Sequence, residues 1–456
     1  MNRRTLLTGA LASVAALPAL PAHAVTAFDM AEFRGTLDAG ENGLRGEGGR
    51  DQTALLFGLL KKASRENRAV FLPPGEYVVA NLAMPPRSRL MAVPGTATLI
   101  HGGGDTFLTA DDCEVLHLDG LVLDGAGRRL ADDLAGLLTA RSCPDVRLTD
   151  CDFTSSAACG VSLTRCGGRI AGSTFTDIGG QAALYSVQAT GLSVRDNEVS
   201  DCGNGGILIH RFEAGADGTI VSGNRISRIR ADRGGTGQYG NGVNLYRADD
   251  CIVSANQIAE CAFTAVRCNS ASNASITGNT CLRSGETGIY AEFRFEGSVI
   301  ANNIVDGATI GVSIANFDEG GRMAVCSNNL IRNLKTQGPY PAEVAGFGIG
   351  IFAEADTVVS GNVVEGAPQY GIGLGWGHFL RNVSATGNIL RSCREGVSVT
   401  VVEGAGTAVI ADNIIAGATD GAVIGRRWAE RATGDLTQSG ERFGHLIVRD
   451  NVVTAS

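Results

Sequence analysis

Short runs of alternating hydrophobic and polar residues recur through most of the chain. Residues 242–246, 288–292 and 311–315, for example, read GVNLY, GIYAE and GVSIA. Alternation with a period of two places the aliphatic side chains on one face of a strand and the polar ones on the other. The pattern therefore predicts many short β-strands whose aliphatic faces share one interior.

A second pattern marks the turns between these strands. A small or polar residue, then Asn, then within two positions an apolar residue occurs ten times, and successive Asn residues are at least 23 positions apart with irregular additions. One supersecondary unit that carries loop insertions gives such spacing, as in a solenoid. The repeated residues are Asn197, Asn224, Asn256, Asn279, Asn303, Asn329, Asn362, Asn388, Asn413 and Asn451.

Short strands without helices between them predict an all-β, single-domain parallel β-helix. Weaker copies of the unit at Val115, Val146 and Ile170 lack the Asn and raise the expected number of coils to about thirteen, with a candidate for one more at residues 90–100. Asn suits the turns because it tolerates left-handed backbone. Stacked Asn side chains can also hydrogen-bond to one another along a ladder.

The segment before the repeats predicts a cap. Apolar residues at positions 55, 56, 59, 60 and 63 have helical spacing, so we expect a helix near Thr53–Ser64 that covers the open end of the solenoid. The motif Leu72-Pro73-Pro74-Gly75-Glu76-Tyr77 follows it.

This order of helix, motif and stacked coils resembles the pectate-lyase superfamily of right-handed parallel β-helices, over about residues 45–456. The resemblance implies work on polysaccharides, mostly acidic ones, by lyases, hydrolases or C5-epimerases. With its N-terminal segment, the whole chain also resembles bacterial twin-arginine-translocated β-helix repeat proteins.

The first 24 residues have the form of an export signal. Arg3-Arg4 precede an apolar stretch at residues 6–20, and Ala22-His23-Ala24 forms a small-x-small cleavage site. The paired Arg favour the twin-arginine route, and an ordinary secretory signal is the alternative. We expect residues 25–44 to be a linker, residues 45–456 to be the β-helix with its cap, and the protein to be periplasmic or secreted after contact with the twin-arginine machinery.

The charge of the mature chain limits its partners. Cleavage after Ala24 changes the net charge from −9 to −11, because the segment holds two Arg and no carboxylate. An acidic exported protein is a poor candidate for binding nucleic acid. No other apolar run is long enough to span a membrane.

The twelve cysteines recur at similar offsets in successive coils, as expected of a small apolar residue stacked in a core. Neighbours in such a column are close enough for one or two disulfides. The spacing fits no zinc site, so we expect no metal and no cofactor, and no Asp cluster supports calcium.

Candidate chemistry lies on the outward face of the strands that follow the Gly-rich breaks. We align one outward column as Ala183, Leu208, Asn244, Arg267, Tyr290, Ser313 and Gly350, and the next as Tyr185, His210, Tyr246, Asn269, Glu292, Ala315 and Phe352. Functional groups concentrate in the middle coils, about 4.8 Å apart, and predict one groove for an anionic sugar chain. The candidate catalytic residues are His210, Tyr246, Arg267 and Glu292. The candidate substrate-binding residues are Tyr185, Arg211, Asn244, Arg247, Asn269, Tyr290, Arg294, Asn316, Asp318 and Trp376.

Three functions fit this patch. A lyase or C5-epimerase abstracts a proton at C5 and needs a cation, Arg267 or Arg247, and a base, His210 or Tyr246. A glycoside hydrolase would use two carboxylates, here Glu292 and Asp318. A non-catalytic envelope protein would only bind glycan. The concentration of His, Tyr and Arg favours the first, and the absence of known superfamily motifs favours the third.

Export provides the first test. Replacing Arg3 and Arg4 by Lys should leave the protein in the cytoplasm, because the twin-arginine route reads the paired Arg. Cell fractionation measures this, and undiminished export of the variant would reject that route.

Overall fold

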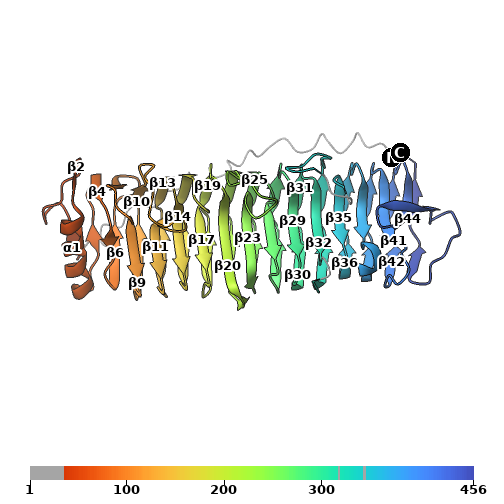
Figure 1. Cartoon of the computed structure of the whole chain (residues 1–456), viewed down its shortest axis with the longest axis horizontal. Coiled ribbons are helices and arrows are strands. Elements are labelled where there is room, and N and C mark those ends of the chain that lie inside the picture. The colour runs from red at the N-terminus through yellow and green to blue at the C-terminus, as the bar shows by residue number, and fades with distance from the viewer. Residues whose placement is uncertain (1–34, 317–318, 342–345, 456) are drawn as a thin grey trace, which may run out of the picture. The chain divides into compact units, whose positions relative to one another are not determined.

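Each coil of the protein consists of three short strands, which stack on the strands of neighbouring coils into three long sheets (Figure 1). The computed structural model describes residues 35–316, 319–341 and 346–455, and Leu37–Ser456 group as one unit. In the described part of this unit, paired strands are parallel except in one hairpin near the C-terminal end. The predicted all-β, parallel β-helix is confirmed.

The sheets are named here A, B and C in the order in which a coil visits them. Sheet A has 16 strands, from β1 (Leu37–Asp38) to β46 (Leu446–Arg449), and sheet B has 16, from β2 (Glu47–Asp51) to β47 (Val452–Thr454). A typical coil contains β21 (Ile220–Ser222), the Asn turn and β22 (Arg225–Ile229), and then reaches sheet C. Sheet C has 15 strands: β5 (Leu82–Ala83), β8 (Leu108–Asp111), β11 (Gly136–Arg141), β14 (Cys159–Thr164), β17 (Leu184–Val187), β20 (Gly205–Ala216), β23 (Asn241–Asp249), β26 (Val266–Asn269), β29 (Thr287–Glu292), β32 (Ile310–Ala315), β35 (Ile349–Ala353), β38 (Tyr370–Leu374), β41 (Glu395–Thr400), β44 (Gly421–Arg427) and β45 (Glu430–Asp435).

The solenoid is longer than the thirteen coils expected, since sheet A contains 16 strands. The additional strands are β1, β3 (Val70–Phe71) and β6 (Arg87–Met91), the last of which overlaps the candidate coil at residues 90–100. Two of them are only two residues long, so they carry no alternation that a sequence pattern could detect. Strand β1 also lies inside the segment that the sequence analysis treats as a linker.

The ten repeated Asn residues form a continuous hydrogen-bonded ladder between sheets A and B. Asn279 is typical: its Nδ2 donates to Asn303 Oδ1 at 3.1 Å and to the Val253 carbonyl at 2.9 Å, while its Oδ1 accepts from the Asn256 Nδ2 at 3.0 Å and backbone N–H at 3.1 Å. Every amide group of this buried side chain is therefore satisfied. The same side-chain bond, 2.8–3.1 Å long, links all ten residues.

The left-handed residue of each turn is the one before the ladder Asn, not the Asn itself. Asp196, Gly223 and Asn302 have φ of 55°, 67° and 58°, whereas the ladder residues are not in this region. The expectation that Asn is there because it tolerates positive φ is therefore wrong. Its amide is needed for the ladder, and the preceding small or polar residue makes the turn.

The predicted alternation is confirmed in sheet C, where the aliphatic residues between the outward positions point into the core. Ile207, Ile209, Val243, Leu245, Ile289, Ala291, Val312 and Ile314 are all at most 1% exposed. The outward residues Leu208, Asn244 and Ser313 are also buried, which we did not expect. Leu208 belongs to a small separate cluster on the outer face with Tyr185 and Val187, so side chains and insertions cover parts of that face.

The predicted cap helix is confirmed as α1 (Thr53–Glu66), whose Leu56, Leu59, Leu60 and Ala63 are buried. Leu55, expected on the same face, is 52% exposed, so the buried stripe is narrower than the sequence suggested. All twelve cysteines are free and buried. No helix among the described residues is long and apolar enough to cross a membrane. The expected signal lies outside the described residues.

The ladder predicts a position-dependent loss of stability. Asn279→Ala removes one partner from Asn256 and another from Asn303, leaving buried donors and acceptors unpaired at a cost of about 3 kcal/mol or more. Asn451→Ala is the matched control, because Asn451 ends the ladder and is only partly buried. Urea denaturation should show a much smaller loss for the control, and equal losses would contradict the ladder's role.

Candidate functional site

The pairing of strands in sheet C determines which candidate side chains lie next to one another on its outer face. The first outward column runs Tyr185, Leu208, Asn244, Arg267, Tyr290, Ser313, Phe352 and Gly373. The second runs Val187, His210, Tyr246, Asn269, Glu292 and Ala315. Tyr185 and Phe352 thus belong to the first column, two residues from their expected alignment. A shift of two keeps a side chain on the same face, so alternation cannot detect it.

Arg267, Asn269 and Glu292 form a buried polar cluster, called here the Arg267 cluster. Arg267 Nε donates to Glu292 Oε1 at 2.6 Å, and Asn269 Nδ2 donates to the same oxygen at 3.0 Å. The side chains of Arg267 and Glu292 are 14% and 3% exposed. Arg267 Nη1 also donates to the Gly237 carbonyl, which lies in the insertion before β23. This guanidinium therefore holds an insertion against sheet C.

Burial and the ion pair act in opposite directions in the Arg267 cluster. Burial raises the pKa of Glu292, although Arg267 and Asn269 act in the opposite direction. Burial would lower the pKa of Arg267, but the Glu292 carboxylate more than offsets this and the pKa is raised. Burial also raises the pKa of the adjacent Tyr290 well above its usual value. The cluster is thus a desolvated ion pair beside a neutral phenol.

A second group, called here the His210 row, crosses three neighbouring strands. The His210 ring centroid lies 5.4 Å from that of Tyr185 and 5.5 Å from that of Tyr246. The Arg247 guanidinium carbon lies 5.1 Å from the Tyr246 ring centroid, a cation–π contact. Burial lowers the pKa of His210 to about 4, so the imidazole is neutral at neutral pH. Its Nε2 is buried and has no hydrogen-bond partner.

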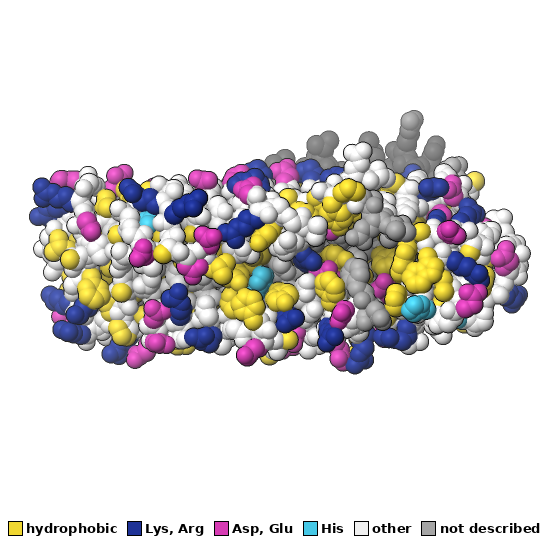
Figure 2. Space-filling model, in the orientation of Figure 1, with side chains coloured by type: hydrophobic (Ala, Val, Ile, Leu, Met, Phe, Trp, Pro, Cys, Tyr) yellow, Lys and Arg dark blue, Asp and Glu magenta, His cyan; other side chains and the backbone are white. Residues whose placement is uncertain are grey.

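An open groove begins where the His210 row ends. Arg247, Asn269, Ser270, Phe293 and Arg294 line it, together with Asp249 and Glu319. Arg247, Ser270 and Phe293 have φ of 54°, 52° and 63° and take the same corner position on three adjacent coils. Exposed Arg247 therefore stands on a repeated, rigid bend of the backbone. On the face seen in Figure 2, hydrophobic side chains gather near the middle of the rod and again toward its C-terminal end.

Several predicted site residues lie elsewhere or have structural partners. Arg211 donates to the Ala189 and Glu213 carbonyls and lies 3.6 Å from the buried Asp217 carboxylate. Exposed Arg294 is paired with Glu319 at 2.8 Å. Asn316 is buried, and its backbone N–H donates to Glu354 Oε2 at 2.6 Å.

The single groove that we expected is therefore divided. Asn244, Arg267 and Tyr290 are consecutive in one column and lie beside the His210 row, whereas Trp376 lies in a separate hollow farther along sheet C. Asp318 lies outside the described residues. No group of three or more candidate metal ligands comes together in the described part of the chain.

The match to known families agrees with this architecture. The family model of the right-handed beta helix region matches residues 135–235 and 212–390, more than half of the chain. The chain belongs to this right-handed β-helix family. The predicted handedness and the resemblance to β-helix proteins are thereby confirmed.

Solved structures with the same fold differ widely in role. The A-module of the mannuronan C-5 epimerase AlgE4 from Azotobacter vinelandii is 15% identical with a TM-score of 0.52, covering 79% of this chain and 97% of that one. The pre-mature gene product 12 of bacteriophage phi29 is 15% identical with a TM-score of 0.51, covering 85% and 55%. At such identity the likeness shows the fold alone. Among the curated proteins none matches the chain.

Sequence reasoning missed several buried carboxylates of this β-helix protein, among them Glu286. Glu286 accepts hydrogen bonds from the Thr264 hydroxyl at 2.9 Å and from the Tyr340 hydroxyl. It lies in the Gly-rich break before β29, outside the outward columns, and Tyr340 comes from an insertion. The one signal in the sequence is a carboxylate beside small residues, Ser284, Gly285 and Thr287, in a break between strands.

The Arg267 cluster should contribute strongly to stability. Glu292→Ala leaves the guanidinium buried without its counter-charge, which costs about 3–5 kcal/mol. Combining it with Arg267→Ala should recover part of that loss in urea denaturation. Arg294→Ala, which breaks an exposed pair, is the control and should change the free energy of unfolding by less than about 1 kcal/mol. If Glu292→Ala is as mild as the control, the pair is not structural.

Proposed function

We propose that this protein is an exported polysaccharide lyase or C5-epimerase that acts on an acidic, uronate-containing polymer. The observation that carries the proposal is the position of the His210 row beside the open groove. The neutral imidazole of His210 lies on one coil, and the phenol of Tyr246 and the exposed guanidinium of Arg247 lie on the next. These are the groups that proton abstraction beside a carboxylate requires.

The reaction assigns a role to each group. A uronate carboxylate beside Arg247 becomes more electron-withdrawing when the guanidinium neutralises it, which makes the proton on C5 more acidic. His210 or Tyr246 accepts that proton, and the electron pair spreads into the carboxylate. In a lyase, expulsion of the C4 oxygen then forms a double bond between C4 and C5. In an epimerase, a proton returns to C5 from the opposite face.

Arg247 is the better cation of the two that the sequence suggested. Its guanidinium lies over the Tyr246 ring and makes only a long 3.4 Å hydrogen bond to the Phe212 carbonyl among the contacts described. Arg267, in contrast, is engaged by Glu292 and the Gly237 carbonyl. We assign Arg267 a positioning role, since the Glu292 oxygen that it binds also holds Asn269 in the groove wall.

The same contacts disfavour the hydrolase alternative. The Glu292 side chain is 3% exposed and its Oε1 is occupied by two donors, so it has little access to a glycosidic oxygen. The mannuronan C-5 epimerase with the same fold supports the class of substrate. A periplasmic or secreted location belongs to the same proposal, because the polymer would be met outside the cytoplasm.

Deuterium incorporation at C5 tests the proposal. The mature chain is incubated with uronate polymers in heavy water. An epimerase should incorporate deuterium at C5, whereas a lyase should give a product with a C4–C5 double bond that absorbs in the ultraviolet. Arg247→Ala should lower turnover by about 100-fold or more, and Arg247→Lys should retain part of it.

Two further variants sharpen the result. His210→Asn should remove the rise of activity with pH that is centred near pH 4, where the imidazole loses its proton. Arg228→Ala, whose guanidinium pairs with Asp201 on sheet B, should leave turnover unchanged. Polymer binding with neither deuterium incorporation nor unsaturated product would establish the non-catalytic alternative. Absence of binding and of both products would reject the site.

A further inference from the structure

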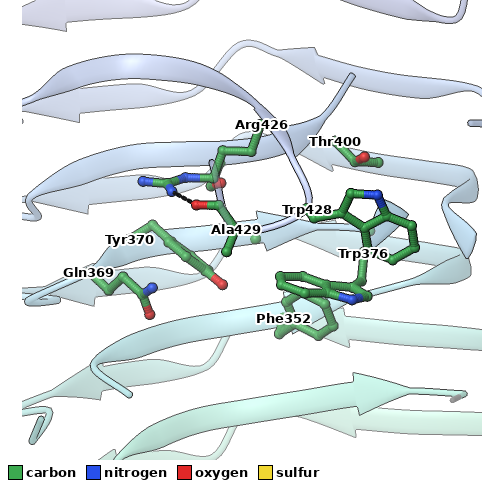
Figure 3. A pocket seen from close by; sticks show the side chains of 11 residues that line it. Phe352, Gln369, Tyr370, Trp376, Thr400, Arg426, Trp428 and Ala429 are labelled. Carbon is green, nitrogen blue, oxygen red and sulfur yellow. Dashed lines mark hydrogen bonds between the residues drawn. The ribbon is translucent and has the colours of Figure 1, made fainter. Parts of the chain in front are cut away.

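A second hollow lies near the C-terminal end of sheet C, well away from the His210 row. Figure 3 shows Trp376 and Trp428 on one side of it and Gln369 and Tyr370 on the other, with Phe352 beside Trp376. The Trp376 and Trp428 ring centroids are 5.8 Å apart, with the rings nearly perpendicular at 71°. The hollow itself is narrow, so its rim is the surface that a ligand meets.

Glycines make room for these rings. Gly373 occupies the outward column between Phe352 and Ser398, and a Cβ there would lie 2.5 Å from the Tyr370 ring. At Gly377, a Cβ would lie 2.3 Å from the Trp428 ring. Any other residue at either place would displace the aromatic wall, so the sequence keeps a bare backbone beneath it.

Trp428 is held at the tip of the only antiparallel hairpin in the described chain. Strands β44 and β45 pair with Arg427 opposite Glu430, which leaves Trp428 and Ala429 to make the turn. Trp428 has a φ of 55° and is 42% exposed. This backbone region is unfavourable for bulky residues. An exposed tryptophan held there at a conformational cost points to a role for its ring.

The lining carries no uncompensated charge. Arg426 donates to the buried Glu395 carboxylate from Nε at 3.2 Å and from Nη2 at 2.5 Å, and from Nη1 to the Ala429 carbonyl at 2.6 Å. Burial raises the pKa of Tyr370, so its phenol is neutral. The remaining polar groups are the Ser398 and Thr400 hydroxyls and the Gln369 amide. Such a lining fits a ligand with an apolar face and several hydroxyls.

We propose that this hollow is a second carbohydrate-binding site, in which an uncharged pyranose ring stacks against Trp376 and Trp428 at the rim. The site is separate from the groove proposed for the uronate polymer. Strand β38 is three strands beyond β29 in sheet C, which is roughly 14 Å at the usual strand spacing. The protein would thus hold a neutral sugar at one end of the face and an anionic one near its middle.

The chain offers a direct reporter for this site. Trp376 and Trp428 are its only two tryptophans, so intrinsic tryptophan fluorescence reports this hollow and nothing else. Titration of the mature chain with neutral gluco- and manno-oligosaccharides should give a saturable change in emission that is the same at low and high sodium chloride. Uronate oligomers should give no such change.

Variants separate stacking from folding. Trp428→Ala should weaken neutral-oligosaccharide binding by about tenfold or more in calorimetry, as expected for losing an aromatic anchor. Trp376→Phe should bind more weakly than the parent but retain a response from Trp428. Phe57→Ala removes a partly exposed aromatic from α1 at the opposite end and should bind like the parent, and circular dichroism confirms that each variant is folded.

The outcomes are distinct from those of the central site. A fluorescence change that survives in Arg247→Ala supports two independent sites, even if no uronate turnover is ever found. No response to any neutral oligosaccharide would overturn the proposal. A response to uronate oligomers alone, weakened by salt, would also overturn it, because the ligand would then be charged.

Discussion

The Asn ladder is the constraint on which the rest of the structure depends. It buries amide side chains between sheets A and B, and a buried amide is tolerated only when all of its hydrogen-bonding groups are paired. Each ladder residue meets this condition only if the next coil places its own Asn one strand spacing away, as the bonds of 2.8–3.1 Å show. Coils from Asn197 to Asn451 are thereby kept in one register.

The ladder fixes the turn between sheets A and B in each coil. Insertions that lengthen a coil therefore occur at its other turns. The insertion between β22 and β23 and that between β34 (Leu330–Arg332) and β35 both enter sheet C at the same edge. The first provides the Gly237 carbonyl to Arg267, and the second provides Tyr340 to Glu286. One side of the outer face is thus covered and dry, while the other side, at Arg247, stays open. This division decides which charges are available to a ligand.

The sequence predicted the features that repeat and missed those that do not. Alternation identified the inward residues, such as Val243 and Ile289, and the spacing of Asn identified the ladder. It could not place Tyr185 or Phe352 in their columns, because a shift of two residues preserves the face. It could not show that the Gly237 carbonyl binds Arg267 or that Asp217 lies beside Arg211, because both partners lie in irregular segments. It placed Glu292 on the strand beside that of Arg267, but alternation does not show that two neighbouring side chains pair. Contacts with irregular segments do not recur at a fixed spacing, so no repeat in the sequence reveals them.

Which charges the outer face of sheet C offers to a ligand depends on which of them already have a partner within the protein. A buried charge is stable only with a partner, and leaving one alone costs several kcal/mol. Arg267 and Arg426 are therefore matched by Glu292 and Glu395 within the protein, and neither has a full charge to offer. What remains for a ligand is exposed Arg247 in the middle and neutral aromatic rings toward the C-terminal end. A rigid solenoid presents both at fixed spacing, so the middle and the C-terminal end of one face suit different sugars.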